Sequence, residues 1–496
     1  MLKLFYSRLS THSLDTFIAS INKKHVGEKI TVHGWIHQTR LKNRFIILRD
    51  STSKIQLNLE NSDLKNKKFN RESVVKVIGF VRNRPEKDSR SSDEFEIIPE
   101  EIHILNPVNH KLPYYPSDRT HLLEENSIKL RHLSLRDPVR QRPFIFKSKL
   151  LLKFRNFLCS KLDFVDIETP VLFRRTPGGA QEFVVPTQQP GLFYSLPQSP
   201  QQFKQLLMIA GFGRYMQIAK CFRDESTRSD RQPEFTQLDL EASFVTRQDV
   251  YSIIEGLLED SWPLVKEFNS RMDELIVPFK RMSYWEAIEK YGTDKPDTRF
   301  NMLLKEDDSL GFTIDQKYSS HLSEVDIGHF FEYAKKLNKN TFLTFREDSE
   351  GVLVQSADKT TESRLTLGIM RKYIADYLSA NKKLEIFNKP IEFLWIENFP
   401  LFEKTPTGYE TVHHPFTAPI DEHYDLIHKD PSSVISQHYD LVCNGQEVGG
   451  GSIRIHNGDL QEYILRNILK VDITDLKHLT EALKDGAPPH GGIALG

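Results

Sequence analysis

The sequence predicts an α+β protein with more than one domain: a small N-terminal β-barrel, then a larger domain built on an antiparallel sheet. A chain of 496 residues is too long for a single hydrophobic core. Residues 30–105 consist of short apolar runs separated by turn and charge clusters, whereas apolar residues take helical spacing after residue 131. A strand–loop–strand pattern at 215–244 then places a hairpin in the larger domain.

The N-terminal barrel is predicted from five β-rich runs within about 75 residues. Such spacing is typical of the OB type of barrel, a common platform for single-stranded nucleic acids. Residues 1–50 carry nine Lys and Arg against three acids, a charge that suits either a polyanion or a solvated surface. The net charge of −1 for the whole chain predicts no partner. The five runs are Ile30–Trp35, Phe45–Arg49, Lys54–Leu59, Val74–Val81 and Phe95–Ile104.

Residues 1–20 have the composition of a mitochondrial targeting segment. They contain Lys3 and Arg8, several Ser and Thr, and no acid before Asp15. We therefore expect a location in the mitochondrial matrix, with the cytoplasm as the alternative. The three cysteines lie far apart, as in proteins of a reducing compartment, and no apolar run is long enough to span a bilayer.

A proline-rich segment and a long helix follow the barrel. Residues 107–130 contain three prolines and predict a linker or hinge. Residues 140–162 carry apolar side chains at helical spacing, and a β segment at Phe164–Ile167 follows. The spacing alone predicts a plain amphipathic helix.

The hairpin carries the most informative side chains of the sequence. Two β-prone flanks, Tyr215–Phe222 and Phe235–Phe244, bracket a polar loop. Alternation places Phe235, Gln237, Asp239 and Glu241 on one face of the second strand, and buried carboxylates need partners. Arg223 ends the first strand with a guanidinium suited to phosphate. The pattern predicts a floor for an anionic ligand, although a charged surface hairpin would share it.

Two stretches of the hairpin resemble motif 2 of class II aminoacyl-tRNA synthetases, in the form found in aspartyl-tRNA synthetases of the bacterial or mitochondrial type. They are Phe222-Arg-Asp-Glu225 and Arg231-Gln-Pro-Glu-Phe-Thr-Gln237. The helix at 140–162 with Thr169-Pro170 is similar to motif 1, the dimer interface of that family. The resemblance implies an OB barrel joined to an antiparallel-sheet catalytic domain with an inserted domain.

The resemblance also divides the chain. It implies an anticodon-binding domain at 25–106 and a linker at 107–130. The catalytic domain would occupy 131–299 and 393–496, interrupted by an inserted domain at 300–392.

The activity that the resemblance implies is aspartate–tRNA ligation by a homodimer. L-Aspartate is activated with ATP and Mg²⁺ and is then transferred to tRNA(Asp). Asparaginyl and lysyl enzymes are the alternatives within the class, and Lys204, Arg454 and the segment Tyr291-Gly-Thr-Asp-Lys-Pro-Asp297 argue against them. A non-catalytic RNA-binding protein on the same scaffold is the alternative outside it.

The resemblance implies roles in ATP binding for residues of motif 2 and of a second hairpin. Catalysis here rests on positioning and charge stabilisation, for which Arg and Mg²⁺ are suited. Arg223 would hold the α-phosphate and Phe235 would stack under the adenine. Asp440 and Glu447, on strands separated by a turn, would bind Mg²⁺. The expected ATP-binding set is Arg223, Asp224, Glu225, Gln232, Phe235 and Glu447, with Arg223 and Glu447 catalytic.

The aspartate pocket and the anticodon site are implied in the same way. Arg454 would clamp the side-chain carboxylate, and Phe45 would stack on a base while Gln56 reads a base edge. Phe45 could instead belong to the barrel core. Gly178 replaces the glutamate that bacterial members use toward the substrate ammonium. The expected aspartate-binding set is Gln201, Lys204, Asp239, His413 and Arg454.

The sequence closes on Gly492-Ile-Ala-Leu-Gly496, which resembles the beginning of motif 3. The arginine that follows in that motif and holds the γ-phosphate is not in the sequence. On this basis we expect weak ATP binding by the 496-residue chain.

Overall fold

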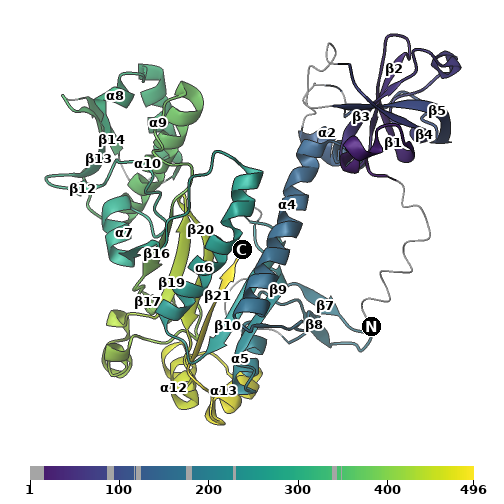
Figure 1. Ribbon diagram of the computed structural model, residues 1–496. Coiled ribbons are helices and arrows are strands. Elements are labelled where there is room, and N and C mark those ends of the chain that lie inside the picture. The colour runs from purple at the N-terminus through teal and green to yellow at the C-terminus, as the bar shows by residue number, and fades with distance from the viewer. Residues whose placement is uncertain are drawn as a thin grey trace. The chain divides into compact units, whose positions relative to one another are not determined.

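The chain divides into two compact units, Met1–Ser148 and Lys149–Gly496, in a computed structural model (Figure 1). The structure describes residues 16–85, 94–116, 118, 124–174, 181–226, 231–337, 343–347 and 349–496. Most of the expected targeting segment and the predicted Gly178 difference lie outside the described residues. The division falls within helix α4 (Pro138–Arg155), later than the boundary expected at residue 131.

The N-terminal unit contains a closed barrel of five strands in the order β1-β2-β3-β5-β4. Alternate residues point inward, and Val32, Ile46, Leu48 and Val77 are completely buried among its core residues. All five predicted runs form strands, and the predicted OB-type barrel is confirmed. The strands are β1 (Lys29–Arg40), β2 (Phe45–Arg49), β3 (Lys54–Asn58), β4 (Val74–Asn83) and β5 (Phe95–Asn106).

The segment after the barrel, which the sequence predicts as a linker, includes short helices and docks on the barrel. These helices are α2 (Glu124–Lys129) and α3 (Arg131–Ser134). Buried Glu72 accepts from Arg49 and from Arg136, each at 3.0 Å. Both guanidiniums contact Oε2 of Glu72 and neutralise the buried carboxylate, whereas its Oε1 has no hydrogen-bond partner among the described residues. This ion pairing therefore fixes residues after α3 to the barrel.

The C-terminal unit is built on an eight-stranded sheet with the order β11-β16-β19-β20-β21-β10-β9-β6. The pairs at its two ends, β11–β16 and β6–β9, are parallel and the others are antiparallel. The predicted antiparallel-sheet domain is therefore confirmed. The strands are β6 (Val165–Asp166), β9 (Arg214–Phe222), β10 (Glu234–Ser243), β11 (Lys280–Ser283), β16 (Phe393–Glu397), β19 (His438–Cys443), β20 (Gln446–Ile453) and β21 (His490–Leu495).

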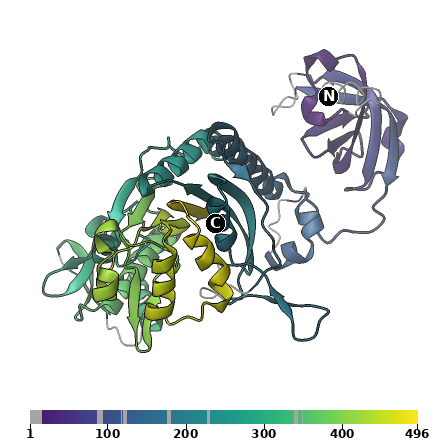
Figure 2. The same ribbon diagram turned by 90° about the horizontal axis from the view of Figure 1, so that it is seen from below.

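The two faces of this sheet differ in character. Leu238, Leu240 and Ala242 of β10 pack with residues of α4 and α6 (Arg247–Phe268) in one apolar core. The alternating residues Asp239 and Glu241 point to the opposite face, which α5 (Gln201–Ile209) contacts. Figure 2 shows α4 and α6 beside the sheet on one side and the yellow C-terminal helices on the other. The polar face therefore carries the charged side chains that can take part in ligand binding or catalysis.

Residues between β11 and β16 form a module with its own core. Its sheet has the order β12-β13-β15-β14, and its core contains Phe312, Phe330, Val354 and Met370. The elements are β12 (Lys305–Glu306), β13 (Leu310–Asp315), α8 (Gln316–Ser319), α9 (Glu324–Leu337), β14 (Leu343–Glu347), β15 (Gly351–Ser356) and α10 (Thr361–Lys382).

Short elements complete the C-terminal unit. The predicted helix at 140–162 corresponds to α4 and a following π-helical turn, Asn156–Lys161. Among the described residues, the structure has no helix long and apolar enough to cross a membrane. The remaining elements are β7 (Val184–Pro186), β8 (Phe193–Ser195), α7 (Tyr284–Tyr291), β17 (Phe402–Thr405), β18 (Gly408–Thr411), α11 (Leu426–Lys429), α12 (Gly458–Tyr463) and α13 (Lys477–Lys484).

Candidate active site

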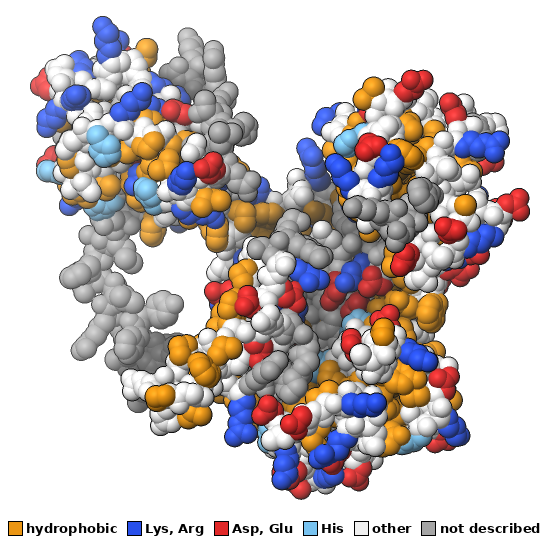
Figure 3. Space-filling model, turned by 180° about the vertical axis from the view of Figure 1, so that it is seen from behind, with side chains coloured by type: hydrophobic (Ala, Val, Ile, Leu, Met, Phe, Trp, Pro, Cys, Tyr) orange, Lys and Arg blue, Asp and Glu red, His pale blue; other side chains and the backbone are white. Residues whose placement is uncertain are grey.

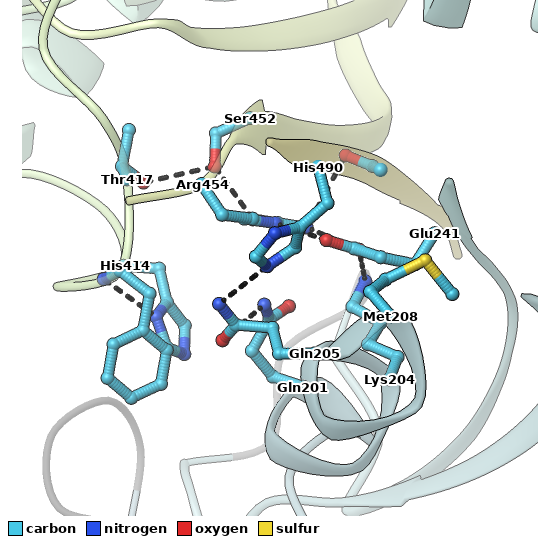
Figure 4. A network of polar contacts seen from close by, with 12 residues as sticks. Gln201, Lys204, Gln205, Met208, Glu241, His414, Thr417, Ser452, Arg454 and His490 are labelled. Atoms are coloured by element: carbon cyan, nitrogen blue, oxygen red, sulfur yellow. Dashed lines mark hydrogen bonds and ion pairs between the residues drawn. The ribbon is translucent and has the colours of Figure 1, made fainter. Parts of the chain in front are cut away.

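Four buried charges form the centre of the polar face. Lys204 Nζ lies 2.7 Å from Asp239 Oδ1 and 3.0 Å from Glu241 Oε2. Arg454 donates to both oxygens of Glu241, at 2.9 and 3.1 Å, and to Ser452 Oγ at 2.7 Å. Figure 4 shows Lys204 and Arg454 converging on Glu241 from the α5 side and the β20 side. Two cations and two anions thus balance in a buried cluster, as buried charges require.

Local sequence explains how these charges meet. The period of two along β10 places Asp239 and Glu241 on one face. Lys204 lies in the first turn of α5, where this helix contacts β10, and Arg454 follows directly after β20. The charges therefore come from three elements that are distant in sequence.

The electrostatics of the cluster are uneven. Burial raises the pKa of Glu241, but the adjacent Arg454 and Lys204 outweigh this effect and lower it to about 2. Burial raises the pKa of Asp239, and the nearby Lys204 only partly offsets that effect. Glu241, which is held by both cations, is therefore the firmly ionised member of the cluster.

A cavity of about 240 Å³ opens beside the cluster. Four of the five predicted aspartate-binding residues line it: Gln201, Lys204, Asp239 and Arg454. Arg223 and Glu447, the predicted catalytic residues, line it as well. Figure 3 shows acidic and basic side chains close together in the middle of this unit. The other lining residues are Ser199, Gln237, His414, His438, Val448, Gly449, Gly450, Gly451, Ala494 and Gly496.

Arg223 provides a cation without a carboxylate partner among the described residues. Its Nε is buried and has no hydrogen-bond acceptor within the described part of the chain. Its guanidinium carbon lies 5.1 Å from the ring centroid of Phe235, and the two side chains share one wall. An unpaired guanidinium facing a cavity is suited to bind an anion such as phosphate.

The rest of the predicted ATP set is more exposed. Glu225 pairs with Arg231 at 2.9 Å, and Asp224 and Gln232 are exposed at the ends of the motif 2 loop. Residues 227–230 between them lie outside the described residues. The structure thus places Arg223 and Phe235 near the cavity and the other three farther along the loop.

Asp440 and Glu447, the predicted Mg²⁺ ligands, lie on adjacent strands at Gly450. A Cβ added to Gly450 would lie 2.7 Å from Asp440 Oδ1 and 3.2 Å from Glu447 Oε1. Asp440 Oδ2 is buried and has no hydrogen-bond donor among the described residues, and burial raises the Asp440 pKa to about 6. An orphaned carboxylate oxygen beside a second acid fits a hard divalent cation. These two residues would therefore hold Mg²⁺.

The histidines lie differently from the prediction. His413 does not line the cavity but stacks on His438, with ring centroids 3.5 Å apart, and its neighbour His414 lines the cavity instead. His438 Nε2 lies 2.8 Å from Asp440 Oδ1, and burial lowers the His438 pKa to about 3. His438 therefore donates to Asp440 as a neutral imidazole.

Buried His490 predicts a loss of stability in acid. His490 Nδ1 lies 2.7 Å from the Pro488 carbonyl, its Nε2 lies 3.2 Å from Gln205 Nε2, and burial lowers its pKa below 6.5. Below pH 6.5 His490 therefore binds a proton in the unfolded chain but stays neutral in the folded chain. This difference lowers the free energy of unfolding by at most about 1.4 kcal/mol for each pH unit. Urea unfolding between pH 5 and 8 should show a shallower pH slope for His490→Gln. Equal slopes in both proteins would contradict this account.

On the barrel, the two predicted anticodon residues share one face of the β2–β3 ladder. Phe45 pairs with Asn58 and Ile47 pairs with Gln56. Phe45 is half-buried and is not part of the described core cluster of the barrel, so the alternative of a core residue is not favoured. The Gln56 amide is already engaged: it donates to Glu96 at 2.9 Å and accepts from Arg84 at 3.0 Å.

Sequence reasoning placed Glu241 on the polar face of β10 but gave it no role in the site, where it binds both cations of the cluster. It missed two further residues. His438 lies two residues before Asp440 on the same strand. Lys295 pairs with Glu447 at 2.8 Å from a distant segment, and nothing in its local pattern indicates this contact.

Comparison with known families agrees with this geometry. Residues 123–496 match the family described as tRNA synthetases class II (D, K and N). Residues 30–105 match the OB-fold nucleic acid binding domain. The two matches correspond to the sheet unit and to the barrel.

Individual relatives are similar over nearly the whole chain. The mitochondrial aspartate–tRNA ligase of Bos taurus is 40% identical over 97% of this chain and 83% of that protein. The aspartate–tRNA(Asp/Asn) ligase of Hydrogenobaculum is 38% identical over 97% of this chain and 91% of its own length. The solved asparaginyl-tRNA synthetase of Pyrococcus horikoshii shares the fold, with a TM-score of 0.66 at 20% identity over 98% of this chain and 93% of that one. The two relatives compared by sequence are named aspartate–tRNA ligases, and the chain belongs to the class II tRNA synthetases (D, K and N).

Proposed function

We propose that this protein is an aspartate–tRNA ligase, which activates L-aspartate with ATP and transfers it to tRNA(Asp). The observation that carries the proposal is the pair of buried cations, Lys204 and Arg454, fixed by Glu241 at the wall of the cavity. Family members use ATP as a substrate, and Arg223, which has no carboxylate partner within the described part of the chain, supplies a phosphate-binding group in the same cavity.

The cation pair accounts for a preference for aspartate. Lys204 uses two of its three ammonium protons on Asp239 and Glu241, which leaves one donor for a ligand. Arg454 donates three of its five N–H groups to Glu241 and Ser452 and a fourth to the Gly492 carbonyl at 3.4 Å, so its one remaining donor has a fixed direction. A substrate carboxylate completes this arrangement, whereas an uncharged amide gives the cations less stabilisation.

The two half-reactions need no protein nucleophile. In the first, the α-carboxylate of aspartate would attack the α-phosphate of ATP and displace pyrophosphate, with Arg223 stabilising the charge that develops there. In the second, a ribose hydroxyl of tRNA would attack the aspartyl carbonyl carbon, and AMP would leave. Asp440 and Glu447 would hold the Mg²⁺ ion, which neutralises phosphate charge. The ring of Phe235, stacked against Arg223, offers a flat surface for the adenine.

Amino-acid-dependent exchange of pyrophosphate into ATP tests this function. We expect exchange with aspartate that exceeds exchange with asparagine or lysine by orders of magnitude, because the remaining donors of Lys204 and Arg454 would meet no side-chain carboxylate acceptor in either competitor. Faster exchange with asparagine or lysine would assign another substrate. Charging of tRNA(Asp) and tRNA(Asn) transcripts would then show whether one or both tRNAs are substrates.

The barrel is proposed to bind the anticodon through the exposed side of the β2–β3 ladder. Phe45→Ala should weaken tRNA binding by about 1–3 kcal/mol, because it removes one base-stacking surface. Pyrophosphate exchange should stay unchanged. The control is Leu105→Ala, another exposed apolar side chain of the barrel unit. Equal losses in charging and exchange, or for both variants, would contradict a specific role for Phe45.

A homodimer is proposed for the motif 1 region. Exposed apolar side chains of the sheet unit gather on α4 and on the segments after it, and a second copy of the chain would cover them. Sedimentation of the purified protein tests this assembly, and a monomer at micromolar concentration would contradict it. The residues concerned are Leu152, Val165, Val171, Leu172, Leu192 and Phe193.

We also propose a mitochondrial location. The support is the name of the Bos taurus relative and the basic, acid-poor composition of residues 1–20. Fusion of these residues to a fluorescent reporter distinguishes import from a cytoplasmic location.

A further inference from the structure

A lysine outside the ligand cavity holds the carboxylate of Glu447. Lys295 lies between α7 and the inserted module, in the segment Tyr291–Asp297. Its Nζ lies 2.8 Å from Glu447 Oε2 and 3.9 Å from Asp294 Oδ2. Lys295 does not line the cavity of about 240 Å³; its direct side-chain contact with the site is Glu447, and its charge also acts on Asp440.

The geometry of Glu447 divides its two oxygens between two roles. Oε2 binds Lys295, whereas Oε1 lies near Gly450, next to Asp440 Oδ1. A Cβ at Gly450 would be within 3.2 Å of both of these oxygens, so a glycine keeps the space between them open. Lys295 thus leaves one oxygen of Glu447 directed at the second acid.

The segment that carries Lys295 is fixed by the inserted module. Arg371 of α10 is 1% exposed and donates to the carbonyls of Asp297, Phe300 and Met302 at 2.9–3.0 Å. Its burial among carbonyl acceptors makes it a rigid clamp on this part of the backbone. Arg299 further binds the Asp297 carboxylate at 2.7 and 2.9 Å.

The β19–β20 hairpin, which carries Asp440 and Glu447, contacts the chain on both sides of the inserted module. Asn444, in the β19–β20 turn, accepts from the Glu392 backbone at 2.9 Å and donates to the Pro390 carbonyl at 3.1 Å. A Cβ at Gly445 in the same turn would lie 3.1 Å from the Asp297 Cβ. Segments before and after the module therefore both contact the hairpin of Asp440 and Glu447.

We propose that Lys295 is a positioning residue, which orients Glu447 for the Mg²⁺ ion that accompanies ATP, and that the inserted module is its rigid support. This inference rests on the proposed function, because that function supplies the metal–nucleotide ligand. If the metal must order a mobile carboxylate when it binds, the site loses affinity for the metal. Residues that hold metal ligands in place commonly raise metal affinity 10–100-fold. The opposing effect is repulsion between the ammonium and the metal, and it predicts tighter metal binding after Lys295 is removed.

Calorimetric titration of ATP at a series of Mg²⁺ concentrations tests the proposal without catalysis. In Lys295→Met we expect the Mg²⁺ concentration that gives half of the maximal ATP affinity to rise by about 10-fold or more. Lys295→Arg should recover most of the affinity, because a guanidinium can still bind Glu447 Oε2. The control is Lys290→Met, which removes a lysine that pairs with Glu286 at 2.8 Å on the surface.

A double-mutant cycle with Glu447→Gln shows whether Lys295 acts through Glu447. In the Glu447→Gln background, Lys295→Met should change the Mg²⁺ dependence by less than twofold. An unchanged or tighter Mg²⁺ dependence in Lys295→Met overturns the proposal, as does an equal loss in both backgrounds. Lys295→Gln serves if the Met variant unfolds below the assay temperature. Wild-type protein that binds ATP without any Mg²⁺ dependence would instead contradict the proposed function.

Discussion

Arg454→Met should lower the free energy of unfolding by about 3–5 kcal/mol, because it leaves Glu241 buried without its bidentate partner. Glu241 and Arg454 are 1% and 4% exposed, so a charge left without its partner there is poorly solvated. Only Lys204, at 3.0 Å, would remain beside the carboxylate, and it must also neutralise Asp239. Urea unfolding monitored by circular dichroism measures the effect.

Two further proteins make this test specific. Arg466→Met removes a surface guanidinium that pairs with Glu462, and it should change the unfolding free energy by less than about 1 kcal/mol. The double variant Arg454→Met/Glu241→Gln should recover part of the loss, because it removes the orphaned charge. An Arg454→Met protein as stable as the wild type would show that the buried cluster does not depend on this pair.

Arg223→Ala should slow adenylate formation by about 10²–10³-fold, which is the usual cost of removing a group that stabilises transition-state charge. The free energy of unfolding should hardly change, since Arg223 has no carboxylate partner among the described residues. Its guanidinium packs against the ring of Phe235. Single-turnover formation of aspartyl-adenylate at saturating ATP and aspartate measures the rate.

The matched control lies on β9, the strand that ends just before Arg223. Lys220→Ala removes an exposed cation that pairs with Glu234 across the hairpin, away from the cavity. Both variants should unfold within about 0.5 kcal/mol of the wild type, because neither removes a buried contact pair. A similar rate loss in Lys220→Ala would indicate a general effect of charge, and an undiminished rate in Arg223→Ala would remove it from the phosphate site.

The fold was predictable where residues have a clear period. Alternation in β10 determines which residues reach the polar face, and it places Phe235, Asp239 and Glu241 on one face from the sequence alone. The barrel strands were equally clear, since each is a short apolar run with a turn at its end. The residues proposed for aspartate became recognisable through the family resemblance, because α5 and β20 supply Lys204 and Arg454 from distant parts of the chain.

The parts that sequence reasoning missed depend on contacts over long distances. No local pattern connects Lys295 with Glu447, because their contact exists only after the inserted module has folded between them. The structure places His414 at the cavity where the sequence predicted His413, and the cause is similar. Successive residues in an irregular turn point in directions that the turn geometry sets, and the ring of His413 finds His438 instead of the cavity.

The unequal faces of β10 make this strand sensitive to length in a way that composition does not reveal. Its side chains alternate between the apolar core under α6 and the charged wall of the cavity. Adding or deleting one residue would send Asp239 and Glu241 into the core and bring Leu238 and Leu240 to the substrate. Evolution can therefore exchange side chains along this strand, but gaps in relatives should collect in the loop before it and never within it.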